Sequence, residues 1–415
     1  MFDRLLSRPS AERLLLGSPL RRRRYAIALI AALLVALAFA GLMTLLVFTS
    51  LSAEVLRMFV TGIGVAALAS LIPVAILWFM DRRERESPWL FAVAFLWGAL
   101  IATGLALPIN NGILRAVSAW VARNPAVGQF LGKEAALMIG APIAGPLVEE
   151  TTKGLGVLAL FLLLRAEFDN VRDGFVYGAL VGVGFNCFEA PLYVAQGLEE
   201  YGFAPWGLQF GSRFALFGLA GHAMYTGIFG AFLGMARQTP RRWVRYAAPV
   251  AGLLIAIGGH AFNNALGLLI TILTRAAGET PPEPGPPPNL GFVESWLTWS
   301  LIDSIIFFPL LALVVVLVWR SGVWERRVIR EELAAEVGGA VTPAEYERIK
   351  ADAIFHTRRI AGQNRRRSAA IVNAQNELAF RKHRVKADGG DPEQDPLIAG
   401  WREQVARLRE TSPPD

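Results

Sequence analysis

Long apolar runs alternate with short polar segments over the first three quarters of the chain. Eight such runs cover residues 25–49, 59–80, 89–109, 137–164, 174–196, 211–236, 247–273 and 296–319. A helix needs about 20 mainly apolar residues to cross the hydrocarbon core of a bilayer. A spanning segment must also satisfy all its backbone polar groups internally, which a helix does. The pattern predicts an all-α polytopic membrane protein with about eight transmembrane helices.

Composition supports this prediction, and the basic residues give an orientation. Of the 415 residues, 54% are hydrophobic and only 18% are charged, whereas about a quarter are charged in a typical soluble protein. If the N-terminus is cytoplasmic, the short inner segments hold 16 Lys and Arg and the outer segments hold 5. Lys and Arg concentrate in cytoplasmic loops, so we expect both termini in the cytoplasm. The net charge of +7 then reflects topology, and no nucleic-acid partner is expected.

Three regions follow from these patterns. They are a basic cytoplasmic N-terminus (1–24), a transmembrane domain (25–319) and a charged cytoplasmic tail (320–415). In the tail, Thr342-Pro-Ala-Glu345 has the form of a capping box with proline at the first helical position, which predicts a helix start. A further short helix is expected over 397–409. The tail is interpreted as a solvated appendage or, alternatively, as a docking segment for anionic lipid or a cytoplasmic partner.

Ionisable side chains inside four of the predicted spans do not suit a lipid environment. A charged residue within a transmembrane segment is a functional hypothesis by default, because its burial without a partner is costly. Many glycines surround these residues, and small residues let helices approach closely enough to enclose a polar pocket. The candidate set, completed by one asparagine, comprises Glu149, Glu150, Lys153, Glu189, His222, His260 and Asn264.

These residues share one depth in the membrane. At a rise of about 1.5 Å per residue, Glu150, Glu189, His222 and His260 each lie roughly 20–22 Å from the cytoplasmic end of their own span. Successive spans run in opposite directions, so this agreement comes from four separate estimates. The sequence therefore predicts that the four helices bring these side chains to one site, slightly to the outer side of the midplane.

Two histidines and several carboxylates at one level suit hydrolysis. One carboxylate can act as a general base for water, and Asn264 can donate a hydrogen bond to a developing oxyanion. His222, His260 and Glu189 can ligate Zn²⁺ and leave a fourth position for water. The same groups can also activate water without a metal, so both mechanisms stay open.

The pair of adjacent glutamates leaves the identity of the base open. Lys153 lies four residues after Glu149 and three after Glu150, so it can reach either carboxylate on one helix face. Helix geometry favours the Glu149–Lys153 pair, which would leave Glu150 as the free base. A purely structural buried ion pair is a further interpretation of this motif.

The order of these motifs resembles the PrsW family of intramembrane proteases, which is related to the CAAX prenyl endopeptidases. The shared pattern is Glu-Glu-x-x-Lys, Phe-x-x-x-Glu, His and His-x-x-x-Asn on successive helices, and Phe185 completes the second motif. The segment from Asp81 to Pro88 also resembles the family, and the likeness extends over roughly residues 60–320. The resemblance implies cleavage of membrane proteins, such as an anti-sigma factor. Analogy with the CAAX endopeptidases, which have histidine where this chain has Glu189, favours the first glutamate as the base.

Two other classes of function fit parts of the same pattern. A proton-coupled transporter or channel could use the Glu/His cluster as a relay, although we see no inverted repeat and no broken-helix pair. A non-catalytic scaffold could act through the tail. The single cysteine, Cys187, is interpreted as packing, Asp303 as a polar contact between helices, and Arg213 as snorkelling or paired with Glu199 or Glu200. The Arg- and Ala-rich composition suits a bacterial inner membrane.

Overall fold

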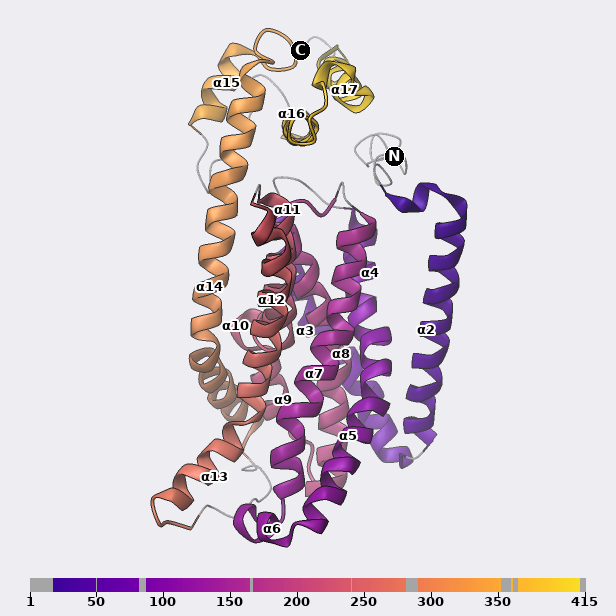
Figure 1. Cartoon of the computed structure of the whole chain (residues 1–415), viewed down its shortest axis with the longest axis vertical. Coiled ribbons are helices and arrows are strands. Elements are labelled where there is room, and N and C mark those ends of the chain that lie inside the picture. Colours follow the sequence, from indigo (N-terminus) through magenta and orange to yellow (C-terminus); the bar gives the residue numbers. More distant parts are fainter. Residues whose placement is uncertain are drawn as a thin grey trace. The chain divides into compact units, whose positions relative to one another are not determined.

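The structure confirms an all-α membrane fold (Figure 1). It is a computed structural model, and it describes residues 18–49, 51–81, 87–164, 167–239, 241–280, 290–351, 360 and 365–410. No β-strand occurs within these ranges. The chain divides into two compact units, a larger one of Leu15–Phe79 and Pro88–Val315 and a smaller one of Met1–Leu14, Met80–Ser87 and Val316–Asp415.

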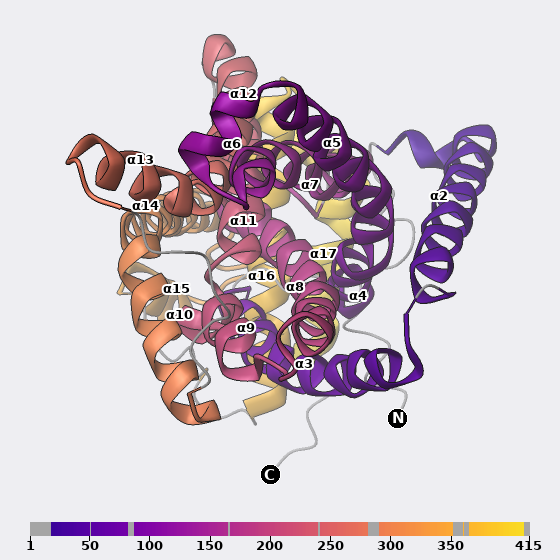
Figure 2. The same ribbon diagram turned by 90° about the horizontal axis from the view of Figure 1, so that it is seen from below.

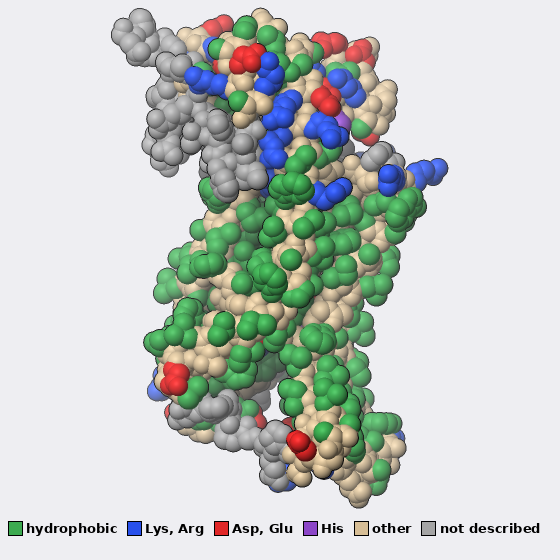
Figure 3. Space-filling model, turned by 90° about the vertical axis from the view of Figure 1, so that its left-hand side faces the viewer, with side chains coloured by type: hydrophobic (Ala, Val, Ile, Leu, Met, Phe, Trp, Pro, Cys, Tyr) green, Lys and Arg blue, Asp and Glu red, His purple; other side chains and the backbone are tan. Residues whose placement is uncertain are grey.

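The larger unit contains the apolar helices. They are α2 (Arg23–Thr49, preceded by the 3₁₀ turn η2, Pro19–Arg21), α3 (Ala53–Met80), α4 (Pro88–Leu96), the π-helical η3 (Trp97–Ala102), α5 (Thr103–Arg123), α6 (Pro125–Leu131), α7 (Ala135–Leu163), α8 (Val171–Tyr201), α9 (Trp206–Arg213), α10 (Ala215–Gly218), α11 (His222–Gln238), α12 (Arg242–Asn264), α13 (Leu266–Ala276) and most of α14 (Phe292–Ala334). Hydrophobic side chains cover most of the face that Figure 3 shows for this unit, as a lipid environment requires.

The sequence predicts about eight spans, and the structure gives candidates for most of them by length and apolar composition. Among the described residues, six helices are long and apolar enough to cross a membrane, or seven if α6 and α7, bent by 93°, form one span. The predicted sixth span, 211–236, is not one helix, because the chain breaks between α9 and α11. At the break Leu216 and Phe217 adopt positive φ angles of 51° and 60°, which costs roughly 1–2 kcal/mol per non-glycine residue.

Helix α8 forms the centre of the larger unit. Figure 2, which looks along the bundle, shows it between α3, α4, α7 and α11. An asparagine–aspartate capping box, Asn170 with Asp173, fixes its start. Its contact with α11 is close because Gly178 and Gly182 lack side chains: a Cβ at either position would lie 2.2 Å from a carbonyl oxygen of α11. This close approach positions the two helices that carry Glu189 and His222.

The smaller unit is folded around its own apolar core. It contains the end of α14, α15 (Pro343–Lys350), α16 (Arg365–Ala387), the 3₁₀ turn η4 (Pro392–Gln394) and α17 (Pro396–Glu410). Thr342 and Glu345 form the predicted capping box, and α17 confirms the expected last helix. Fully buried side chains such as Leu333, Ile371 and Leu378 pack together. The tail is therefore a compact unit, which its charged composition did not predict.

Some sequence predictions fall on residues outside the described ranges. These are 82–86 within the segment Asp81–Pro88, and most of the basic N-terminus, 1–17.

Candidate active site

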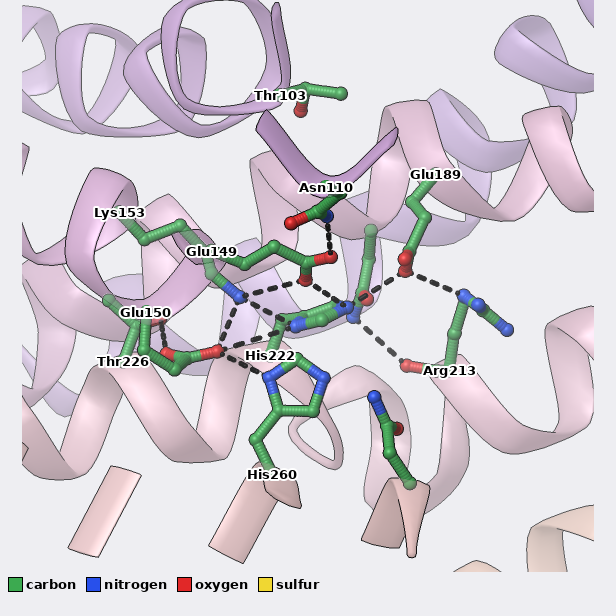
Figure 4. A network of polar contacts seen from close by, with 12 residues as sticks. Thr103, Asn110, Glu149, Glu150, Lys153, Glu189, Arg213, His222, Thr226 and His260 are labelled. Atoms are coloured by element: carbon green, nitrogen blue, oxygen red, sulfur yellow. Dashed lines mark hydrogen bonds and ion pairs between the residues drawn. The ribbon is translucent and has the colours of Figure 1, made fainter. Parts of the chain in front are cut away.

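Four helices bring the predicted ionisable residues together inside the larger unit (Figure 4). Helix α7 carries Glu149, Glu150 and Lys153, while Glu189, His222 and His260 come from α8, α11 and α12. All six are buried, and Lys153 is 0% exposed. The convergence that the shared depth predicts is confirmed, whereas the catalytic roles of these residues stay predictions.

Glu150 is the most fully hydrogen-bonded carboxylate of the site. Its Oε1 atom lies 2.5 Å from Lys153 Nζ and 3.0 Å from His260 Nδ1. Its Oε2 atom accepts a hydrogen bond of 2.9 Å from the Thr226 hydroxyl. The expected preference of Lys153 for Glu149 is wrong, since Lys153 Nζ lies 3.9 Å from Glu149 Oε2. The side chains of α11 and α12 that meet Glu150 decide this pairing, and helix spacing alone could not show them.

Glu149 keeps one oxygen without a hydrogen bond. Its Oε1 atom accepts from Asn110 Nδ2 at 3.0 Å, whereas its buried Oε2 atom has no hydrogen-bond partner among the described residues. The Nε2 atom of His222 lies 3.8 Å from this oxygen. Asn110 was missed from the sequence because it directly follows the predicted end of the third span, at residue 109, whereas α5 continues to Arg123. The adjacent pair Asn110–Asn111 was the available signal.

His222 is held from both sides of its ring. Its Nδ1 atom lies 2.6 Å from Lys153 Nζ, and its Nε2 atom lies 2.8 Å from Glu189 Oε2. The Phe185 ring packs edge-on against the imidazole, at 4.7 Å between centroids. Lys153 in turn lies 4.3 Å from the centroid of that same Phe185 ring. Phe185 of the Phe-x-x-x-Glu motif therefore forms an apolar wall of the site.

His260 and Asn264, both on α12, form a further side of the site. The His260 ring stacks on Tyr225 with centroids 5.0 Å apart and lies 4.9 Å from the His222 ring. Asn264 Nδ2 donates to the carbonyl oxygen of Ala141 at 3.2 Å, and its second amide hydrogen is left to donate to an oxyanion.

The structure also shows the surroundings of Arg213, Cys187 and Asp303. The expected partners of Arg213, Glu199 or Glu200, are wrong: Arg213 Nε lies 3.0 Å from Glu189 Oε2. Cys187 is buried within an apolar cluster of α3, α8 and α9, as its interpretation as packing predicts. Asp303 is buried on α14.

The candidate metal site differs in one ligand from the predicted set. Ligand atoms of Glu149, His222 and His260 all lie within 4.8 Å of one another. The unsatisfied Oε2 atom of Glu149 and the chemistry of two imidazoles with a carboxylate suit a divalent cation such as Zn²⁺. Glu189, the third ligand that we predicted from the sequence, is instead engaged with Arg213 and His222.

Comparison with known proteins identifies one similar family. Residues 86–278 match the model of the PrsW family of intramembrane metalloproteases. This segment is similar to the PrsW family. The match is shorter than the predicted 60–320 and contains every candidate site residue. No curated protein and no solved structure matched the chain.

The similarity of residues 86–278 to the PrsW family indicates a broad function. It supports a peptidase that acts on membrane proteins within the lipid bilayer, and the apolar helices agree with a multi-pass membrane protein. The smaller unit, Val316–Asp415, lies outside the matched segment.

Proposed function

We propose that the chain is an endopeptidase that hydrolyses peptide bonds of membrane-associated proteins with water activated at Glu149. The supporting observation is the buried Glu149 Oε2 atom, which has no hydrogen-bond partner in the described part of the chain and faces a histidine of α11. A carboxylate with one available oxygen can accept a proton from water, whereas Glu150 has both oxygens occupied. This assignment agrees with the analogy that favours the first glutamate.

The proposed reaction follows general base catalysis. Glu149 takes a proton from water while the water oxygen bonds to the carbonyl carbon of the scissile peptide. Asn264, whose amide nitrogen keeps a second hydrogen beside the one that it donates to Ala141, is the candidate to stabilise the oxyanion. Glu149 then returns the proton to the leaving nitrogen as the carbon–nitrogen bond breaks. Glu150 stays fixed by its three donors and orients Lys153 and His260.

The residues present also fit a metal. Glu149, His222 and His260 would hold it, and a bound Zn²⁺ would supply Lewis-acid activation of water and of the peptide carbonyl. His222 has both ring nitrogens engaged, with Lys153 and Glu189, so it must exchange one of these contacts to become a ligand. We therefore infer that Lys153 competes with a cation for the same imidazole.

Cleavage by the purified full-length chain tests this proposal. We expect Glu149→Gln and His260→Ala to abolish cleavage of a single-span membrane protein reporter in proteoliposomes, with a loss of at least about 100-fold for the missing base. Metal analysis of wild-type and His222→Ala protein separates the two mechanisms, because a metal-dependent enzyme loses its metal with the histidine. Unchanged cleavage in both catalytic variants would refute the site.

The natural substrate is proposed by analogy. We infer a membrane-anchored regulator, such as an anti-sigma factor, in a bacterial inner membrane. Comparing membrane-protein fragments from cells with and without the gene identifies it. A substrate candidate is rejected if its fragments persist in cells that carry only the Glu149→Gln variant.

A proton-coupled transporter is the second candidate, because one observation favours it. The break between α9 and α11 places non-helical backbone beside His222, and transporters use discontinuous helices at their binding sites. The absence of a broken span, which we inferred from the sequence against a transporter, no longer holds. A transporter would produce pH-dependent flux in proteoliposomes with no cleavage of the reporter.

A further inference from the structure

Arg213 and His222 contact the same oxygen atom of Glu189. Arg213 Nε lies 3.0 Å and His222 Nε2 lies 2.8 Å from Glu189 Oε2. The two residues are nine positions apart, so one continuous helix would separate them by about 13 Å along its axis. The break between α9 and α11 removes this separation, and Figure 4 shows both side chains directed at Glu189. The strained turn therefore has a definite geometric consequence at the site.

Arg213 is itself held in place by the elements around it. Its Nη1 atom donates to Gln209 Oε1 at 2.5 Å, and its guanidinium lies 4.7 Å from the centroid of the Tyr193 ring. Its backbone carbonyl accepts a hydrogen bond from Asn186 Nδ2 at 3.2 Å. The planar, permanently charged guanidinium suits such a site, because it can hold a carboxylate and stack on a ring together.

The contacts of His222 select one form of its ring. The Lys153 ammonium only donates hydrogen bonds, so His222 Nδ1 accepts, and an ionised Glu189 carboxylate only accepts, so His222 Nε2 donates. Which nitrogen of a histidine carries the proton is fixed in this way by the partner of the other nitrogen. The orientation of the His222 ring thus depends on a Glu189 carboxylate that Arg213 keeps in position and charged.

We propose that Arg213 is a positioning residue that acts through Glu189 to fix the orientation and tautomer of the His222 ring. Its importance for cleavage depends on the proposed function, whereas its effect on the ring does not. Glu189 is accordingly assigned to holding His222 and not to binding a metal.

Imidazole nitrogen NMR of the full-length, chelator-treated protein tests the proposal without any substrate. The chain has four histidines, and His222→Gln identifies the His222 signals by their loss. Wild-type protein is expected to show one His222 tautomer with the proton on Nε2. Arg213→Met should produce a mixture of tautomers or exchange broadening, and Arg213→Lys should restore part of the single form. A wild-type spectrum in Arg213→Met would overturn the proposal.

A double variant separates the effect on His222 from a loss of folding, and a second variant is a matched control. Arg213→Met leaves Glu189 as a buried carboxylate without its cation, which can unfold the protein. The double variant Glu189→Met/Arg213→Met removes both charges and should fold, yet it leaves His222 Nε2 without its acceptor. A single, wild-type tautomer in the folded double variant would contradict the proposal. Arg237→Met is the matched control, since Arg237 also lies over an aromatic ring, Phe161, at 4.2 Å but contacts a backbone carbonyl instead of the site.

Activity then separates this inference from the proposed function. If the reporter is cleaved, Arg213→Met should lower kcat roughly tenfold or more with KM little changed, as is usual when a residue that orients a site ligand is lost. Arg213→Lys should keep part of the wild-type kcat. Arg237→Met should leave kcat at the wild-type value. If neither the wild-type protein nor any variant cleaves the reporter, the protease proposal fails. The NMR result still decides the role of Arg213. Equal kcat values in Arg213→Met and wild type would overturn its contribution to catalysis.

Discussion

At the scale of single residues, neighbours from other helices give two adjacent glutamates different environments. Glu149 and Glu150 differ by one position, yet Glu150 meets Lys153, His260 and Thr226 while Glu149 meets Asn110. A carboxylate that receives three hydrogen bonds is a fixed structural centre. A carboxylate with one unsatisfied oxygen is available for chemistry. The structure therefore supports different consequences for the same substitution at the two positions.

We expect Glu150→Gln to destabilise the protein and Glu149→Gln to leave its stability nearly unchanged. Removing the Glu150 charge leaves Lys153 as a buried ammonium without its closest partner, and breaking a buried pair in this way costs about 3–5 kcal/mol. Thermal unfolding of both variants in the same detergent measures the difference. Equal melting temperatures for the two variants would contradict the structural role of Glu150.

At the scale of elements, glycines and a broken helix position the site. Helices α8 and α11 approach so closely that backbone of one meets backbone of the other at Gly174, Gly178 and Gly182. Without a hydrophobic driving force in lipid, close packing is a main source of association between helices. The break after α9 then turns the chain so that α11 starts at His222. These two features, and not the hydrophobic pattern, place His222 opposite Glu189.

Gly178→Ala is expected to destabilise the bundle and to reduce cleavage. A Cβ at this position would lie 2.2 Å from the carbonyl oxygen of Thr226, so α8 and α11 must move apart, and overpacking of this kind typically costs about 1–3 kcal/mol. Gly112→Ala is the control, because nothing among the described residues lies within 4 Å of the added Cβ. Thermal unfolding and reporter cleavage are compared for the two variants. An equal effect of both would show that the close contact does not matter.

At the scale of the whole molecule, the chain contains a second folded unit with its own electrostatic centre. Glu336 receives two hydrogen bonds from the Arg402 guanidinium, at 3.0 and 2.8 Å, and a further contact from Lys382. Burial alone would raise the pKa of Glu336, but hydrogen bonds from Arg402 and Lys382 outweigh it and lower the pKa below the usual value. These contacts connect the end of α14 with α16 and α17.

The stability of this unit is expected to fall in acid. Because the folded state lowers the Glu336 pKa, the stabilisation is complete above the ordinary glutamate pKa of about 4.3 and is lost as the pH falls through the lower folded value. Hydrogen-exchange protection of α16 and α17 in the full-length chain measures this change. Glu336→Gln should reduce protection at pH 7 and bring the variant and wild type together in acid. A difference that stays constant from neutral pH to about pH 3 would contradict the prediction.

The amino-acid sequence determined the class of the protein and the members of its candidate site. Apolar runs of about 20 residues favour spanning helices, so the all-α membrane fold follows from local composition even though the run 211–236 is broken. Charged residues within such runs need polar partners, so their shared depth was enough to predict that Glu150, Glu189, His222 and His260 converge. The capping box at Thr342 was equally local and was predicted for the same reason.

Tertiary structure alone decided how these residues are paired. Lys153 prefers Glu150 because His260 and Thr226 approach the same carboxylate from other helices, which no spacing within α7 reveals. Arg213 meets Glu189 because two residues adopt strained backbone angles after it, and a hydrophobic average over 211–236 does not detect that break. The core of the tail likewise forms from scattered apolar residues of several short helices. Local periodicity determines which segments are buried. The contacts between distant segments determine the chemistry of the site side chains.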